Sequence, residues 1–454
     1  MKTGTSLSGQ SLLQSLRDKF KRFPDHRDPT RIEIAIEDFL MSGLAVFQMK
    51  FPSLLKFEEE MKSVKNLSNL TSMFGVSRVP SDTHARSLID EIGVENFRPL
   101  FNDLFSKAQR AKVLERFRVF DSHYLLAVDG TGYFFSDSVH CESCIEKKHK
   151  TTGESTYHHQ MLCGAIVHPE KNTVIPMCPE GVLKQDGDTK NDCEQNAMKR
   201  FLLKFREDHP KLKTILLTDA LHSTLPRLED LKALDMGFIL AVKPGSHTKL
   251  FEGVDKWDER GQVRHFTVEE EIGDKVKKKR IHHYRYTNGI LLNHQSVHMT
   301  VNFLEYWETT QWVSPKGELK EEKRHFSWVT DFSLYESSCQ QIMRAGRTRW
   351  KIENETFNTL KNQGYEFEHN FGHGYKNLST NFANLMMLAF MVDQLQELGC
   401  ELFQAALRAR FNKRSRLWEM FKAIYTFLPT IESYHQFLDM IAHPESWKVV
   451  PNSS

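Results

Sequence analysis

Three acidic residues occupy places in the sequence where a carboxylate could take part in a reaction. Asp129 interrupts a strongly apolar run at residues 124–135 and is followed by a glycine. Asp219 ends a short apolar run at residues 213–218, and ligands bind at the carboxyl ends of strands in open α/β sheets. Glu353 lies on a predicted helix among cations. Carboxylate oxygens are hard ligands that suit Mg²⁺ or Mn²⁺.

Each acid also has an ordinary structural explanation. Asp129 could open a tight turn, and Asp219 could cap the helix that follows it. Glu353 could form an ion pair with Arg349, four residues earlier on the same helix. The three acids together, in this order along one predicted sheet, favour a shared site.

The patterns around the first two acids predict an α/β fold. Apolar and alternating runs predict strands, and amphipathic runs between them predict helices. In chain order we expect strands at residues 124–135, 159–168 and 173–182, a helix at 191–205, a strand at 213–219, a helix at 224–234 and a strand at 237–242. This order indicates an α/β core with a largely buried sheet.

The remaining segments flank or interrupt that core. Basic residues are dense before residue 32, which fits either a solvated helical face or a DNA-contacting arm. We expect a helical N-terminal DNA-binding region at residues 1–118, the first part of the core at 119–244, a β-rich insertion without a substantial helix at 245–326, the last core strand and the Glu353 helix at 327–375, and a helical C-terminal region at 376–454.

From residue 119 to about residue 375 the chain resembles the DDE transposases of bacterial insertion sequences. The resemblance rests on the strand with Asp129, the strand ending in Asp219, the β-rich insertion and, most specifically, Arg-Trp-Lys-Ile-Glu at residues 349–353. It is to the branch with a β-strand insertion before the last catalytic helix. It implies an RNase H-like catalytic core interrupted by a β-rich insertion, with helical N-terminal and C-terminal regions.

In that family an Asp, an Asp and a Glu bind two divalent metal ions, so the resemblance gives these roles to Asp129, Asp219 and Glu353. Two Mg²⁺ or Mn²⁺ ions about 3.5–4 Å apart can activate an attacking oxygen and stabilise the leaving oxygen at a phosphodiester. Water would be the first nucleophile and a freed 3′-hydroxyl the second. The implied activity is cleavage at transposon ends followed by strand transfer into target DNA.

The last helix departs from the family pattern. The family places a tyrosine three residues before the arginine, where this chain has Gly346, and a lysine seven residues after the glutamate, where it has Leu360. Lys361 comes one residue later, and such a shift turns a helical side chain by about 100°. Glu355 is the alternative third carboxylate, although the Arg-Trp-x-Ile-Glu frame favours Glu353.

Cations around the last helix favour a nucleic acid partner. Arg349 resembles the family's phosphate contact, and Arg347, Lys351 and Lys361 are further candidates. A helix with ordinary salt bridges would carry similar residues. Trp328 resembles a tryptophan that stacks on a flipped base in related transposases that form hairpin ends, although a tryptophan on a strand is more often a core residue.

A second cluster has the composition of a metal site. Cys141 and Cys144 form a Cys-x2-Cys pair, one half of many tetrahedral zinc sites, and His149 or His158 could complete it. No second pair with metal-ligand spacing follows in the sequence. A reduced loop without metal, facing DNA, is the alternative.

Composition narrows the class of protein. With 40% hydrophobic and 26% charged residues among 454, the chain is neither fibrous nor wholly disordered. No apolar run approaches the roughly 18 residues that span a membrane, and seven cysteines do not suggest a disulfide framework. We therefore expect a cytoplasmic protein. The resemblance to bacterial transposases further implies association with the nucleoid and binding of double-stranded DNA, both transposon inverted-repeat ends and target DNA, as a homodimer.

Two other functions remain open at this stage. An RNase H-like DNA nuclease could cut without strand transfer, and a DNA-binding protein derived from a transposase could lack catalysis. The second would be expected to lose the acids, and all three are present.

Overall fold

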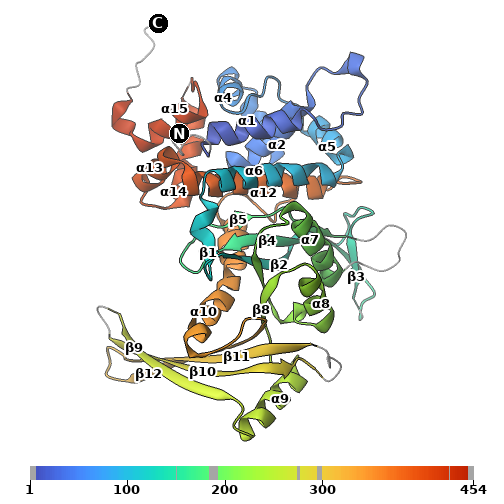
Figure 1. Ribbon diagram of the computed structural model, residues 1–454. Coiled ribbons are helices and arrows are strands. Elements are labelled where there is room, and N and C mark those ends of the chain that lie inside the picture. Colours follow the sequence, from blue (N-terminus) through green and yellow to red (C-terminus); the bar gives the residue numbers. More distant parts are fainter. Residues whose placement is uncertain are drawn as a thin grey trace.

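The computed structural model describes residues 7–149, 151–183, 193–273, 277–293, 299–428 and 430–447. Figure 1 shows a helical layer at the top, a mixed α/β core in the middle and a projecting β-sheet insertion at the bottom. None of the described helices is long and apolar enough to cross a membrane.

The core is built around one strand, β2 (His123–Ser136). It pairs antiparallel with β4 (Ser155–Val167) and parallel with β7 (Thr214–Thr218), which pairs parallel with β8 (Gly237–Ala241). Antiparallel strands followed by parallel ones give the RNase H-like arrangement predicted from the sequence. The crossovers run through α7 (Glu194–Asp208) and α8 (Leu225–Ala233), and short strands lie beside β2 and β4: β1 (Arg118–Val119), β3 (Ile145–Lys148), β5 (Ile175–Pro176) and β6 (Glu180–Val182).

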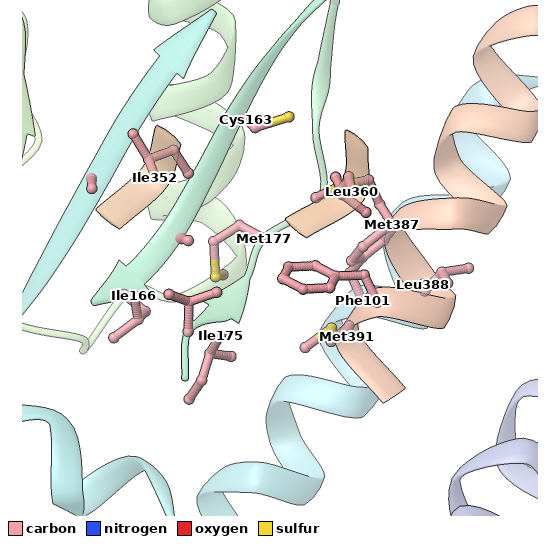
Figure 2. Close-up of a cluster of buried hydrophobic side chains, with 14 of the residues drawn as sticks. Phe101, Cys163, Ile166, Ile175, Met177, Ile352, Leu360, Met387, Leu388 and Met391 are labelled. Atoms are coloured by element: carbon pink, nitrogen blue, oxygen red, sulfur yellow. The ribbon is translucent and has the colours of Figure 1, made fainter. Parts of the chain in front are cut away.

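The central strands are apolar because both faces of the sheet are covered. Residues 125–128 of β2 and 215–217 of β7 are fully buried. Figure 2 shows side chains of β4 meeting the helix that carries Glu353 and two helices of the upper layer, α6 (Arg98–Arg110) and α12 (Leu378–Gly399). Parallel strands covered on both faces read as continuous apolar runs, which is why the sequence predicted them well.

The insertion is an antiparallel extension of the same sheet. It contains β9 (Arg264–Ile272), β10 (Lys278–Leu291), β11 (Thr300–Val313) and β12 (Leu319–Thr330). The last three residues of β12 also pair with β8, so one strand belongs to both the insertion and the core. The expectation that this segment lacks a substantial helix was wrong, because α9 (Thr248–Glu259) packs Leu250 and Val254 into the insertion.

The two ends of the chain form one helical layer. Its N-terminal members are α1 (Gly9–Phe20), α2 (Ile36–Gln48), α3 (Leu54–Met61), α4 (Val64–Phe74), α5 (Asp82–Glu91) and α6, and its C-terminal members are α12, α13 (Glu401–Ala409), α14 (Arg414–Phe427) and α15 (Tyr434–Ala442). Helix α12 is buried along almost all of its length, where it packs against α2 and α5 of the layer and against β5 of the core, as expected for a helix without a solvent face.

Many basic residues near the start of the chain have acidic partners within this layer. Arg17 donates to Asp38 at 2.8 Å, and Arg27 pairs with Asp25 at 2.6 Å. Lys19 lies 3.8 Å from Asp103. These pairings give the basic run a structural purpose, and whether it also contacts DNA stays a prediction.

Candidate active site

Asp129 and Asp219 stand at equivalent positions on neighbouring parallel strands. β2 and β7 pair with a constant register that ends at Ala127 opposite Leu217. Two residues further along each chain come Asp129 and Asp219, at the carboxyl ends of the paired segments. This is the edge where ligands bind in α/β sheets.

Asp219 also caps the short helix that follows β7. Its Oδ1 accepts a hydrogen bond from the backbone N–H of Leu221 at 3.0 Å. The ordinary structural explanation for this residue therefore holds, and it leaves the other carboxylate oxygen available for a second partner.

Arg349 joins Asp129 to Glu353. Its Nη1 donates to Asp129 Oδ2 at 2.9 Å, and its Nη2 lies 2.8 Å from Glu353 Oε1. The guanidinium thus forms a bridge between a strand of the core and the helix that carries Glu353, which is the last helix of the catalytic core. Glu353 is half exposed and Asp129 is mostly buried, so the acids border solvent.

The surroundings of Asp129 change its protonation. Its pKa is raised to about 6, first by burial and to a smaller extent by the nearby carboxylates of Glu353 and Asp219, although Arg349 and the backbone N–H of Gly130 lower it. Arg349 is the cation that bonds to these carboxylates within the described chain. An all-oxygen cluster in which a buried carboxylate is reluctant to ionise fits a site for divalent cations.

Glu353 lies in a local widening of its helix. The chain runs through α10 (Glu336–Arg347), a 3₁₀ turn (Thr348–Trp350), a π-helical segment (Ile352–Phe357) and α11 (Asn358–Asn362). The apolar residues Ile352, which begins the π-helical segment, and Leu360, which follows it in α11, are fully buried in the same cluster (Figure 2). Such π-helical turns are frequent at functional sites.

Comparison with known families decides which family this site belongs to. The family model of the transposase DDE domain matches residues 120–392, more than half of the chain. The chain belongs to the DDE transposases. Comparison with curated proteins finds no match.

The second glutamate of this helix, Glu355, has other charged neighbours than the aspartates. Burial raises the pKa of Glu355, and the charges around it are those of Arg414, Lys351 and Glu397. Two of these belong to C-terminal helices. The geometry therefore favours Glu353 over Glu355 as the third carboxylate, and its catalytic role stays a prediction.

The π-helical segment accounts for the shifted lysine. A π turn closes over one more residue than an α turn, so eight residues cover the rotation that seven cover in an α-helix. Ile352 and Leu360 share one face although they are eight residues apart. Glu353 and Lys361 have the same separation, and Lys361 forms an ion pair with Glu368 at 2.7 Å at a partly exposed position.

Two of the predicted DNA contacts have partners within the protein. Lys351 is only 3% exposed and donates to the backbone carbonyl of Lys171. Arg347 pairs with Glu308 at 2.7 Å and lies over the Phe326 ring. We correct the assignment of Lys351, because its ammonium is committed to the β4–β5 connection. Arg347 links the last helix to the insertion.

Trp328 also has a different role from the one predicted. It is 3% exposed in β12, its ring stacks on Phe326, and a Cβ on Gly346 would come within 2.5 Å of its Nε1. Gly346, at the family's tyrosine position, makes room for this indole. The prediction that Trp328 stacks on an extruded base does not fit its buried position. By contrast, Trp350, which follows Arg349 in the 3₁₀ turn, is 43% exposed.

Sequence reasoning missed an acid–imidazole pair beside the site. Glu194, at the start of α7, lies 2.9 Å from His222 Nε2, and a Cβ on Gly130 would come within 2.5 Å of the Glu194 carboxylate. His222 follows Asp219 by three residues and is buried. The position of His222 just after Asp219 was the available signal, whereas nothing in the spacing indicated Glu194.

The cysteine pair lies apart from the carboxylates and has other partners than the predicted one. Cys141 and Cys144 meet His159 of β4 and His373, which follows the last helix. His149 is exposed and uses its backbone to bond Glu154 and Gly153 in the β3–β4 turn. The expectation that His149 belongs to the cysteine cluster was therefore wrong.

Proposed function

We propose that this transposase cleaves DNA at the ends of a mobile element and transfers the freed ends into target DNA. The observation that carries the proposal is the convergence of Asp129, Asp219 and Glu353 around Arg349. Two aspartates at one sheet edge and a glutamate from the last helix form the three-carboxylate set of the family. The proposal specifies the reaction, whereas membership of the family shows only that the chain is a transposase.

Asp129, Asp219 and Glu353 would hold two ions such as Mg²⁺ or Mn²⁺, which when bound activate the attacking oxygen and stabilise the leaving oxygen. The protein's own contribution is position. β2 and β7 fix the two aspartates by a shared register, and the buried residues Ile352 and Leu360 fix the helix of Glu353. A site held by packed elements keeps its groups in reacting geometry without further ordering.

Arg349 would change partners when DNA binds. In the structure its guanidinium forms ion pairs with Asp129 and Glu353. If these carboxylates held metal, Arg349 would be released from them as a planar, bidentate donor beside the site. Guanidinium groups match phosphate geometry, so Arg349 would bind the phosphate next to the scissile bond.

DNA is the partner implied by membership of the family. We propose that it enters along the side of the last helix that exposes Arg349, Trp350 and Lys361. An exposed tryptophan between cations suits stacking on an unpaired base. Transposition joins two ends, so we also propose that two copies of the chain act together as a homodimer on inverted-repeat ends and target DNA.

The proposal is tested by Mg²⁺-dependent cleavage of a labelled duplex that carries the element's own end. Asp219→Asn and Glu353→Gln should each lower cleavage by roughly 100-fold or more. Glu355→Gln is the matched control on the same helix and should cleave at nearly the wild-type rate. A target plasmid in the same reaction reports strand transfer.

The outcomes separate the alternatives. Cleavage with joined products supports the transposase, whereas cleavage without them indicates a nuclease of the same core. Loss of activity in Glu355→Gln but not in Glu353→Gln would move the third carboxylate to Glu355. DNA binding without cleavage under any metal condition would indicate a protein derived from a transposase that has lost catalysis.

A further inference from the structure

Four metal-ligating side chains from three separate parts of the chain converge outside the carboxylate site. Cys141 and Cys144 lie in the connection between β2 and β3, His159 lies on β4, and His373 lies in the segment between α11 and α12. One ligand atom from each lies within 4.8 Å of all the others. Cys144, His159 and His373 are buried, and Cys141 is partly buried.

The distances between these atoms fit a tetrahedral zinc site. The two Sγ atoms are 3.9 Å apart, His159 Nε2 is 3.4 Å from each sulfur, and His373 Nε2 is 3.3 Å from Cys144 Sγ. With Zn–S near 2.3 Å and Zn–N near 2.0–2.1 Å, a tetrahedron separates two sulfurs by about 3.8 Å and a sulfur from a nitrogen by about 3.5 Å. A disulfide would need the sulfurs about 2.0 Å apart.

The surroundings give these side chains few other partners. The Nδ1 atoms of His159 and His373 are buried and have no hydrogen-bond partner among the described residues. Among the described residues, the hydrogen-bond contacts of their Nε2 atoms are to sulfur, and a thiol is a weak hydrogen-bond partner. Burying two imidazoles against two thiols is unfavourable unless a cation binds all four. The rings are held in place by Phe134, whose centroid is 4.3 Å from that of His373.

Local backbone geometry also suits thiolate ligands. Residues 141–144 form a turn in which the N–H of Cys144 donates to the carbonyl of Cys141 at 3.2 Å. The N–H of Cys141 is directed at Cys144 Sγ, 3.5 Å away. Hydrogen bonds of this kind stabilise the negative charge on a metal-bound sulfur.

We propose that Cys141, Cys144, His159 and His373 bind one zinc ion. Four protein ligands in a largely buried cluster leave no open position, which is the arrangement of structural zinc sites rather than catalytic ones. The ion would connect the β2–β3 connection and β4 to the segment that follows the Glu353 helix. The inference does not depend on the proposed reaction.

The position of His373 shows what the ion would hold in place. Five residues later the chain enters α12, and the Asp90 carboxylate accepts hydrogen bonds from the N–H groups of residues 375–378. Gly372 and Gly374 on either side of His373 adopt φ of 149° and 68°, which favour glycine. This irregular segment is therefore fixed by Asp90 at one end and would be fixed by zinc at the other.

The test measures metal in the full-length protein purified under reducing conditions. Wild type should contain about one zinc ion per chain, and Cys144→Ser and His373→Ala should contain roughly tenfold less. His149→Ala and Cys193→Ser are matched controls outside the cluster and should keep the wild-type content. Exchange of zinc for Co²⁺ should give the visible absorption of tetrahedral cobalt with a thiolate charge-transfer band.

His373→Cys keeps four ligands and guards against a folding failure of the other variants. It should retain the metal and strengthen the thiolate band of the cobalt form. The proposal is overturned if wild type binds neither zinc nor Co²⁺, if His373→Ala keeps its full zinc content, or if mass spectrometry finds Cys141 and Cys144 in a disulfide in the purified protein.

Discussion

The guanidinium of Arg349 lies 2.9 Å from the carboxylate of Asp129, a residue 220 positions earlier in the chain. The same guanidinium reaches Glu353 one turn later on its own helix. This contact draws the last helix to the central strand, so the two acids occupy one site before any metal ion binds. It also makes the charge balance of the site dependent on one side chain.

Replacing Arg349 should therefore change the pH dependence of cleavage. The pKa of Asp129 is about 6, raised mainly by burial and lowered in part by Arg349, so Arg349→Ala should move that pKa upward. The pH at which cleavage is half lost on acidification should rise with it, and the plateau rate should fall roughly 10–100-fold. Arg349→Lys, which keeps the charge without the bidentate fork, should restore the pH midpoint more than the rate. Arg110→Ala, at the exposed end of α6, is the control, and a profile unchanged in Arg349→Ala would contradict the bridge.

The aspartate itself should make the metal-free protein less stable at neutral pH. The folded protein binds the Asp129 proton more tightly than the unfolded chain does, because the pKa is raised from 3.8 to about 6. Stability from this group is therefore complete below about pH 4 and is lost as the pH rises toward 6. At pH 7.5 without metal, Asp129→Asn should stabilise the protein by about 1–3 kcal/mol.

Thermal unfolding with and without Mg²⁺ checks this sign. Mg²⁺ should raise the Tm of the wild type, because an ion that binds the folded state stabilises it, and should leave Asp129→Asn unchanged. The same comparison at pH 4 should show no advantage for Asn. A lower stability of Asp129→Asn in metal-free buffer at pH 7.5 would show that the carboxylate is better accommodated than its burial implies.

Exchanging two neighbouring residues on the helix that carries Glu353 tests whether the family's spacing or the observed packing of the helix determines where the lysine can lie. Leu360→Lys with Lys361→Leu would put the lysine seven residues after Glu353, as in the family pattern. Leu360 is fully buried, so the exchanged protein should lose about 3–5 kcal/mol of stability instead of gaining activity. Lys361→Ala alone should fold normally and reduce the salt dependence of DNA binding by about one charge. Full activity in the exchanged protein would rule out our account of the π-helical segment.

A buried ion pair should be essential for the helical layer. Lys50 donates to Asp393 at 2.7 Å with both side chains almost completely buried, and Tyr365 donates to the same carboxylate. Lys50→Met should destabilise the protein by about 3–5 kcal/mol, because it leaves a buried carboxylate without its cation. Lys50→Met with Asp393→Leu should recover most of that loss, as measured by denaturant unfolding. Equal stability of the single and double variants would mean that the two residues are not coupled.

The sequence was sufficient to predict features that follow from the order of the strands. It was not sufficient for features that depend on the direction in which a side chain points. The positions of Asp129 and Asp219 at one edge of the sheet could be predicted because apolar strands that end in an acid place that acid at the carboxyl end of the strand. Lys351 and Trp328 were assigned to DNA by residue type, but residue type does not reveal which face of an element is buried. Both proved to lie in the core.

The cysteine cluster shows a second limit. Cys141 and Cys144 were visible as a pair, and local spacing then pointed to His149. The ligand atom closest to Cys144 comes from His373, 229 residues away, and no periodicity in the sequence connects such distant segments. The π-helical segment was hidden for a related reason, since one extra residue in a helix turn is visible only against the packing of Ile352 and Leu360.

The joint helical layer has a consequence for how the protein is made. Helix α2 and Lys50 leave the ribosome early, yet Asp393 and α12, against which they pack, lie 343 residues later. At 5–20 residues per second that interval lasts roughly 17–70 s. During synthesis the apolar side of α2 therefore has no α12 to pack against for this time. Neither the N-terminal region nor the catalytic core can reach its final packing until translation has passed residue 400. A product truncated before that point would lack α12, against which both regions pack.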